Sequence, residues 1–326
     1  MQGSENQDFI FEDITKNGRK RKWREKKLSS IDLANRLEIL GYRSFDRVYQ
    51  CGEVLKFMEQ ADGTKKLAQA YFCKNKLCAI CNWRRSLKYS YQSELIINEA
   101  LNRIPKGRFV FITLTVKNVA GEDLNKTISA MSVGFNRLMK YKAIERNVEG
   151  YLRSTEVTYS EGRGDYHPHL HVLLFVKPSY FKGGKYIKQS DWSSYWQKAM
   201  KLEYTPVVDV RAVKPRNGKN EEEEIRKAIL ETAKYPVKPF DVVEKDGLSL
   251  TEEDKLQITD DMMNGLYRKR QIGFGGIFKE IKKELELDDV EDGNLVRTGD
   301  DTESVSTGRE IVAIWNWERK NYVVKA

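Results

Sequence analysis

The sequence predicts an α+β fold in which amphipathic helices pack on an antiparallel sheet, and three observations indicate this class. Residues 109–116 have the apolar alternation of a strand, and the apolar residues that follow them recur every three or four positions, as in a helix. Residues 151–159 and 167–176 form two more strand-like segments around a turn at 161–164, which predicts a hairpin. The alternation in the first strand sends Val110, Ile112, Leu114 and Val116 to one face, and Phe109, Phe111, Thr113 and Thr115 to the other.

The other elements follow from the same periodicities. We expect Ser30 to cap a helix through Leu33 and Leu37, and residues 85–102 to form a second helix before Pro105. Beyond the hairpin, the pattern predicts a helix over 192–202, a strand over 207–213, a helix over 221–235, helices over 252–287 that break near Gly273, Gly275 and Gly276, and a closing hairpin of 311–317 with 322–324. These elements suggest three regions: a basic, cysteine-rich region 1–105, a sheet region 106–241 and an extension 242–326.

Composition favours a polyanionic partner. Lys and Arg outnumber Asp and Glu by 57 to 48, so the formal net charge is +9, and nucleic acid is the first candidate. The sequence has no run of about 20 apolar residues that would span a membrane, and residues 1–11 lack the apolar stretch of a signal peptide. We therefore expect a cytoplasmic protein with no membrane partner, whose four cysteines are thiols or metal ligands rather than disulfides.

The histidines are the most informative side chains. The chain has three, His167, His169 and His171, and all lie within five residues at the start of one predicted strand. Strand side chains alternate between faces, so the three imidazoles project to the same side. Two of them can hold one divalent ion, whereas the alternative is a stack of polar residues on a solvated face.

The register of the predicted hairpin indicates Glu156 as a candidate third ligand. If residues 161–164 form a four-residue turn, Glu156 lies opposite His169, and a register shifted by two places it opposite His171. Two imidazoles and a carboxylate leave open positions for substrate oxygens, as a catalytic Mg²⁺ or Mn²⁺ site requires. The alternative is that Glu156 pairs with a cross-strand Arg or Lys. His167 lies one step further along the strand, where we expect it to support a ligand or contact DNA.

A second group of reactive residues lies on the helix predicted over 221–235. Glu231 and Tyr235 are four residues apart and therefore share a helix face, and Pro236 ends or kinks the helix there. The phenol is a weak nucleophile because its ordinary pKa is about 10, and Lys234, Lys238 or a metal would favour the phenolate. Taken alone, a Glu and a Tyr at this spacing are usually structural.

Five segments, in chain order, resemble the motifs of the HUH endonucleases, in which two histidines flank a hydrophobic residue. They are residues 73–85, 111–115, 151–158, 169–171 and 231–235. The resemblance is closer to the replication initiators (Rep proteins) of small rolling-circle plasmids of Gram-positive bacteria, and it extends from about Cys51 to Lys238. It implies a ferredoxin-like antiparallel sheet with helices on one face and the metal on the other.

The resemblance also implies a function, a strand-specific DNA nickase and ligase that starts plasmid rolling-circle replication. Tyr235 would attack a phosphodiester at the double-strand origin, hold a 5′-phosphotyrosine and free a 3′-OH primer. His169 and His171 would hold Mg²⁺ or Mn²⁺, and Glu231 would activate water for the terminating cleavage. The DNA would contact Tyr235, Lys234 and Lys238.

The implied partners are plasmid origin DNA, both as a duplex and as the single-stranded nick site, and the host replication machinery. The sequence contains no GxxxxGK[ST] phosphate loop, so a host helicase would unwind the DNA. A homodimer stays open as an alternative to a monomer.

The cysteines predict a structural zinc site. Cys73, Cys78 and Cys81 have the spacing of a metal knuckle, and Cys51 is the remaining thiolate. The alternative is a set of buried or surface thiols. A zinc ion there would hold Arg84, Arg85 and Lys88 in place to contact origin DNA. The basic residues from Lys16 to Lys27, which surround Trp23, form either a phosphate-contacting arm or a solvated tail.

Other functions fit parts of the sequence. A conjugative relaxase or a transposase shares the HUH chemistry, but the tyrosine of most relaxases lies near the N-terminus. A non-enzymatic zinc-knuckle DNA-binding regulator would keep its function in Tyr235→Phe, whereas an initiator would lose it. A zinc hydrolase would act without DNA.

Overall fold

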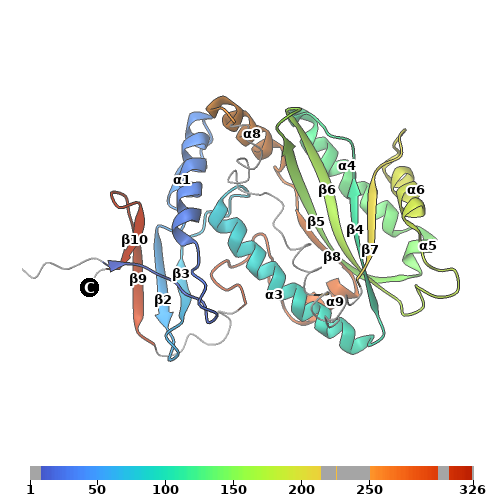
Figure 1. The fold of residues 1–326 in the computed structure, drawn as a ribbon, viewed down its shortest axis with the longest axis horizontal. Helices are drawn as coiled ribbons and strands as arrows, with labels where there is room; N and C mark the ends of the chain where they lie inside the picture. The colour runs from blue at the N-terminus through green and yellow to red at the C-terminus, as the bar shows by residue number, and fades with distance from the viewer. Residues whose placement is uncertain (1–8, 214–224, 226–249, 300–307, 325–326) are drawn as a thin grey trace, which may run out of the picture. The chain divides into compact units, whose positions relative to one another are not determined.

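The computed structural model describes residues 9–213, 225, 250–299 and 308–324 of the chain. These residues form two compact units, which are described separately (Figure 1). Unit 1 contains the described chain up to Lys88 together with the described residues from Asp292 onward, and unit 2 contains those from Tyr89 to Glu291. The helix predicted over 221–235 lies outside the described residues except for Ile225.

In the described part of unit 1, five strands form an antiparallel sheet next to two helices. The strand order is β1 (Phe9–Ile10), β10 (Asn321–Val324), β9 (Glu310–Asn316), β2 (Val54–Glu59) and β3 (Lys65–Ala70), and the helices are α1 (Trp23–Ile39) and α2 (Phe45–Tyr49). The predicted closing hairpin is confirmed as β9 and β10. It pairs with β2, so strands from the two ends of the chain share one sheet.

Helix α1 begins earlier than the sequence predicted. Ser30 lies inside it rather than at its start, and the Ser30 hydroxyl donates a hydrogen bond to the carbonyl of Lys26, so the predicted cap is wrong. Trp23 starts the helix, and its indole N–H donates to the carboxylate of Asp13 at 2.8 Å. Burial of Trp23 against Phe57 explains the early start, because apolar burial outweighs a missing cap.

The described strands of unit 2 form an antiparallel sheet with ferredoxin-like connections. Its order is β7 (Val208–Ala212), β4 (Arg108–Thr115), β6 (Asp165–Val176), β5 (Val148–Ser160) and β8 (Ile272–Gly276). The chain passes through β4, helix α4 (Gly121–Met139), β5, β6, helix α6 (Gln189–Met200) and β7. This βαββαβ path places β6 between β4 and β5, and β4 between β6 and β7, so the predicted α+β class and antiparallel sheet are confirmed.

Helices α4 and α6 cover one face of this sheet, as expected (Figure 1). Phe135 and Met131 of α4 and Trp192 and Trp196 of α6 pack against the inward residues of β4 and β6. The face is apolar because the alternation of each strand sends every second aliphatic side chain toward the helices. The short helix α5 (Lys142–Glu145) connects α4 to β5.

The opposite face, which carries the histidines, is also partly covered, and the sequence patterns did not predict this. Ile96 and Ala100 of α3 (Ala79–Arg103) and Phe278 of α9 (Ile277–Glu284) form a second core with Phe109 and Phe175 of the sheet. Helix α3 confirms the helix predicted over 85–102 and begins six residues earlier. The boundary between the two units falls within it, after Lys88.

The glycines near residue 275 form a strand rather than helix breaks, which corrects the helical prediction for that segment. Helix α8 (Glu252–Gly265) ends before them, and Gly273, Gly275 and Gly276 belong to β8. A Cβ on Gly275 would lie 2.1 Å from the ring of Tyr151 on β5, so a larger residue there would displace that ring. In the described ranges, no helix is long and apolar enough to cross a lipid bilayer.

Candidate functional site

The β5–β6 hairpin of unit 2 has the register that the four-residue turn predicted. Ser160 pairs with Asp165, Glu156 with His169, and Ser154 with His171. Directly paired side chains lie on the same face of a sheet, so Glu156 and both histidines project together. The three side chains are almost fully buried, with 5% of Glu156 and 8% of each histidine exposed.

Three ligand atoms converge at this point. The Nε2 atoms of His169 and His171 are 3.1 Å apart, and the Oε2 atom of Glu156 lies 3.3 Å from the first and 2.8 Å from the second. Two ligands bonded at about 2.1 Å at right angles in an octahedral site are about 3.0 Å apart. The observed spacings therefore match one triangular face of an octahedron, which leaves the opposite face to water or substrate oxygens.

The Nδ1 atoms of both histidines contact polar groups of the protein. Nδ1 of His169 lies 3.2 Å from the backbone carbonyl oxygen of His167, and Nδ1 of His171 lies 3.2 Å from the hydroxyl of Thr113. Because a carbonyl only accepts hydrogen bonds, Nδ1 of His169 carries the proton and Nε2 presents its lone pair to the cluster. Thr113 on β4 is directly paired with His171 on β6, and the ring of Phe111 stacks on the His171 ring.

The protonation of Glu156 is set by two opposing effects. Burial by itself would raise the pKa of its carboxyl, but the hydrogen bonds and charges of His169 and His171 outweigh burial and hold the pKa well below its ordinary value. Glu156 is therefore a carboxylate at neutral pH. Imidazole nitrogens and a carboxylate oxygen are donors that divalent ions bind in proteins, so this convergent set suits such an ion.

Sequence reasoning placed Glu156, His169 and His171 together but missed the supporting residues. Thr113 and Phe111 were assigned to the correct face by alternation, and their contacts with His171 were not foreseen. His167 contacts His169 through its backbone carbonyl, and its ring lies 5.3 Å from the His169 ring. The residues predicted on the tyrosine helix, Glu231, Lys234, Tyr235 and Lys238, lie outside the described residues.

The four cysteines meet in unit 1. Cys51 follows α2, Cys73 follows β3, and Cys78 and Cys81 flank the start of α3. The sulfur of Cys51 lies 3.6 Å from those of Cys78 and Cys81, and Cys73 lies 3.6 Å from Cys81. All four thiols are free and buried, and their sulfurs lie within 4.8 Å of one another. Sulfurs bonded to zinc at about 2.3 Å in a tetrahedron are about 3.8 Å apart, so the residues fit this ion.

Polar groups surround the thiol cluster. The Ser30 hydroxyl, which donates its proton to the carbonyl of Lys26, lies 3.3 Å from the sulfur of Cys78. The backbone N–H groups of Cys73 and Lys74 point at the sulfurs of Cys51 and Cys81, at 3.4 Å and 3.2 Å. Such contacts stabilise thiolates, because each N–H dipole offsets part of their negative charge.

Lys27 is a buried cation next to the same cluster. Its ammonium donates to the carbonyl oxygens of Tyr49 and Cys51, at 2.6 Å and 3.0 Å, and lies 5.7 Å from the centre of the Trp317 ring. Burial lowers the pKa of Lys27 below its ordinary value, whereas the charge of Cys51 acts in the opposite direction. Lys27 therefore belongs neither to a phosphate-contacting arm nor to a solvated tail, and no sequence pattern indicated this role.

Arg84, Arg85 and Lys88, which we expected to contact DNA, are buried in unit 1. Arg84 donates to the carbonyls of Leu295 and Val296, and Lys88 donates to the carbonyl of Asn294. Arg85 donates to the carbonyls of two residues just before α3, Lys74 and Asn75. These charges hold backbone segments together, and their burial does not favour a direct contact with phosphates.

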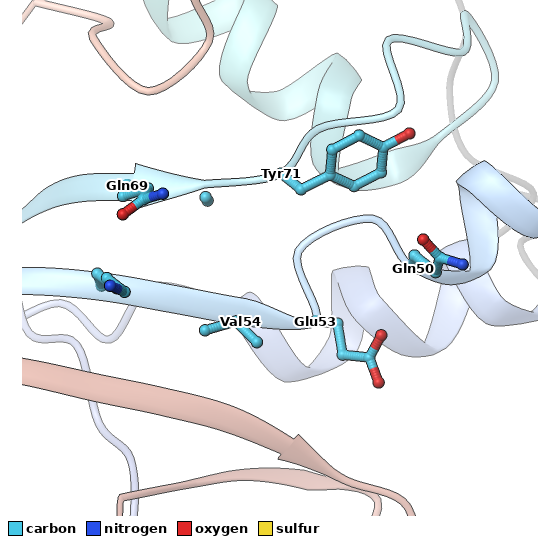
Figure 2. Close-up of a pocket in the computed structure, with 7 residues that line it drawn as sticks. Gln50, Glu53, Val54, Gln69 and Tyr71 are labelled. Atoms are coloured by element: carbon cyan, nitrogen blue, oxygen red, sulfur yellow. The ribbon is translucent and has the colours of Figure 1, made fainter.

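A separate hollow of about 460 Å³ lies on unit 1 (Figure 2). Its lining comes from the end of α2, from β2 and β3 and from the residues next to these strands, and it includes Gln50, Glu53, Val54, Gln69 and Tyr71. None of the described residues that line it belongs to the cysteine or histidine clusters, so this hollow is not the candidate catalytic site.

Comparison with known proteins identifies relatives over the whole chain. Residues 64–323 match the family described as "Replication protein". A "Protein rep" of Streptococcus pneumoniae serotype 2 (strain D39 / NCTC 7466) is 50% identical over 329 residues, which cover 100% of this chain and 98% of the relative. A "Protein rep" of Lactiplantibacillus plantarum is 45% identical, with 97% of this chain and 99% of the relative covered. No solved structure matches the chain.

Proposed function

Since the chain belongs to the replication protein family, we propose that it initiates plasmid rolling-circle replication by nicking one strand at the double-strand origin. One observation carries this proposal beyond the family assignment. The Nε2 atoms of His169 and His171 and the Oε2 atom of Glu156 form a buried triangle with octahedral spacing. A cluster of this kind suits a site that holds a divalent ion against a phosphate.

In the proposed reaction, the phenol oxygen of Tyr235 bonds to the scissile phosphorus and the bond from phosphorus to the 3′ oxygen breaks. The phenol proton is lost, and the leaving 3′ oxygen takes up a proton and becomes the 3′-OH primer. The 5′ phosphate stays on Tyr235 as an ester. Because this ester conserves the energy of the broken bond, a later attack by a 3′-OH rejoins the strand without ATP. In the terminating cleavage, Glu231 takes a proton from water, the water oxygen bonds to the phosphorus at the regenerated nick site, and the bond from that phosphorus to its 3′ oxygen breaks.

Residues of β4 and of the β5–β6 hairpin orient the ligands in this scheme. The His167 carbonyl and the Thr113 hydroxyl fix the two imidazole rings, and burial keeps Glu156 and its partners in one geometry. A bound Mg²⁺ or Mn²⁺ would neutralise negative charge on the non-bridging oxygens of the scissile phosphate.

The cysteine cluster has a structural part in the proposal. Four thiolates around zinc form a closed site with no open position, so the ion would stabilise unit 1 rather than react. Its ligands come from the α2–β2 connection, the β3–α3 connection and the first turn of α3, which a zinc ion would join. Unwinding of the origin is left to a host helicase.

The decisive experiment detects the covalent intermediate. The protein is mixed with Mn²⁺ and a labelled single-stranded oligonucleotide that spans the nick region of its plasmid origin, and the products are separated on a denaturing protein gel. Wild type is expected to give a labelled adduct that is absent in Tyr235→Phe. Tyr195→Phe is the matched control, because it removes a phenol oxygen from a half-buried tyrosine on α6.

Two results would count against nicking by Tyr235. An adduct that persists in Tyr235→Phe would assign the nucleophile to another residue. The absence of any adduct, with duplex origin DNA still bound, would favour a non-enzymatic DNA-binding regulator and would leave the histidine cluster without its proposed role.

A further inference from the structure

The loop between β6 and α6 of unit 2 exposes two stacked aromatic rings. Phe181 is 37% exposed and Tyr186 is 42% exposed, and their rings lie 5.7 Å apart at an angle of 26°. Tyr180, next to them, is fully buried, and its hydroxyl accepts a hydrogen bond from the backbone N–H of Ile187. The buried Tyr180 anchors the loop to the core, so the exposed rings of Phe181 and Tyr186 are held in place at the surface.

A basic hollow of about 670 Å³ adjoins these rings. Phe181 and Lys182 line it from the loop, Lys106 from the turn that leads into β4, and Arg108 from the first position of that strand. Among the described residues of its lining, none is acidic. The aromatic–basic surface is defined here as Phe181, Tyr186 and the exposed lysines Lys106, Lys182, Lys185 and Lys188.

We propose that the aromatic–basic surface binds a single-stranded stretch of DNA, a role that rests on the nicking function proposed above. Exposed aromatic rings stack on bases of any sequence, and neighbouring lysines contact the phosphates. The occupant is a single strand because the bases of a duplex already stack on one another and do not present their faces to a protein ring.

The position of the aromatic–basic surface on unit 2 fits a DNA strand that leaves the nick site. On β4 and β6, Thr115 pairs with His169 near the ligand cluster, and Arg108 pairs with Val176 at the other end. Five residues separate His171 from Val176, which is about 17 Å along a strand. Helices α3 and α9 cover the sheet face between these points, so DNA would pass around them and would need at least about five nucleotides at about 3.4 Å each. The surface would hold DNA several nucleotides away from the cleaved bond.

The first test measures stacking. Binding of a fluorescent, random-sequence single strand of about 16 nucleotides is followed by anisotropy without added divalent metal, so no cleavage is required. Phe181→Leu/Tyr186→Leu keeps apolar volume and removes both π faces, and we expect at least about tenfold weaker binding of the single strand. Phe181→Trp/Tyr186→Phe keeps the faces and should retain the wild-type affinity.

Tyr267→Leu is the matched control for this pair, since Tyr267 is an aromatic residue of unit 2 that is 62% exposed outside the surface. The proposal is overturned if the Leu pair binds the single strand as tightly as wild type. It is equally overturned if Tyr267→Leu weakens binding to the same extent.

The second test measures charge and stays informative if the aromatic variants fold poorly. Lys182→Ala/Lys185→Ala should reduce the salt dependence of single-strand binding by about 0.7 in log–log slope for each phosphate that the protein no longer neutralises. Lys126→Ala/Lys198→Ala removes two exposed lysines of α4 and α6 and should leave the slope unchanged. Equal slopes for both pairs would overturn the proposal. Because neither test needs the adduct, a failure of nicking by Tyr235 and a failure of this surface give different results.

Discussion

The Nε2 atom of His171 lies 2.8 Å from the Oε2 atom of Glu156, although fifteen residues separate the two in sequence. The hairpin turn and the alternation of β5 and β6 produce this contact, since Glu156 pairs with His169 and the next inward position on β6 is His171. The ligand set of the proposed metal site therefore depends on strand register.

Glu156→Gln should weaken metal binding while keeping the shape of the side chain. An amide has no negative charge, so we expect at least about a tenfold loss of Mn²⁺ affinity and a matching shift in the Mn²⁺ concentration needed for adduct formation. Calorimetric titration and the adduct assay measure the two effects. Glu145→Gln, on the exposed surface of α5, is the control. An unchanged Mn²⁺ dependence in Glu156→Gln would remove Glu156 from the ligand set.

Acid should remove the stability that Glu156 contributes in protein without added divalent metal. Although burial acts to raise the pKa of this carboxyl, the histidines lower it below its ordinary value of 4.5, so the folded state binds this proton less readily than the unfolded state. The contribution is present above about pH 4.5 and is lost as the pH falls through the lower, folded pKa. Urea unfolding from about pH 7 to about pH 3 should show the gap between wild type and Glu156→Gln narrowing in acid. A constant gap would contradict this.

Lys27→Met should weaken zinc retention by the cysteine cluster. Four thiolates and Zn²⁺ carry a net charge of −2. The buried ammonium of Lys27, which donates a hydrogen bond to the Cys51 carbonyl, offsets part of this charge. Competition with a chromophoric chelator should show about tenfold lower zinc affinity. Lys22→Met makes the same change at an exposed position just before α1 and should have no effect. Equal zinc affinities would show that Lys27 acts on stability alone.

Gly275→Ala should destabilise unit 2, because the added Cβ would lie 2.1 Å from the Tyr151 ring and would displace that ring from its packing against Phe135. Overpacking of this kind costs about 1–3 kcal/mol in the free energy of unfolding. Gly162→Ala is matched, since a Cβ in that turn meets nothing within 4 Å and should change stability little. Denaturant unfolding of both variants decides the point, and equal midpoints would contradict the proposed close approach.

The resemblance to replication initiators, drawn from five short segments, is confirmed by the family match. The segments with regular periodicity were also predictable. The strand predicted over 109–116 is β4, and the alternation assigned its side chains to the correct faces, although the core on the second face was not predicted. Segments without a clear period were not predictable. Gly273 and Gly275 were interpreted as a break in a helix, whereas they belong to β8. The strand could not be predicted locally, because β8 pairs with β5, whose Tyr151 lies more than a hundred residues earlier.

The sequence by itself determined that Glu156 shares a hairpin face with the histidines, and it determined the residue types of both candidate metal clusters. A two-residue period and a short turn are local properties, and they are enough to place Glu156 beside His169 and His171. The tertiary structure alone decided the surroundings of these clusters: Thr113 on His171, Lys27 beside Cys51, and the burial of Arg84, Arg85 and Lys88. The reason is physical: whether a charged side chain meets water, phosphate or a backbone carbonyl depends on which distant segments fold against it, and no local pattern encodes that choice.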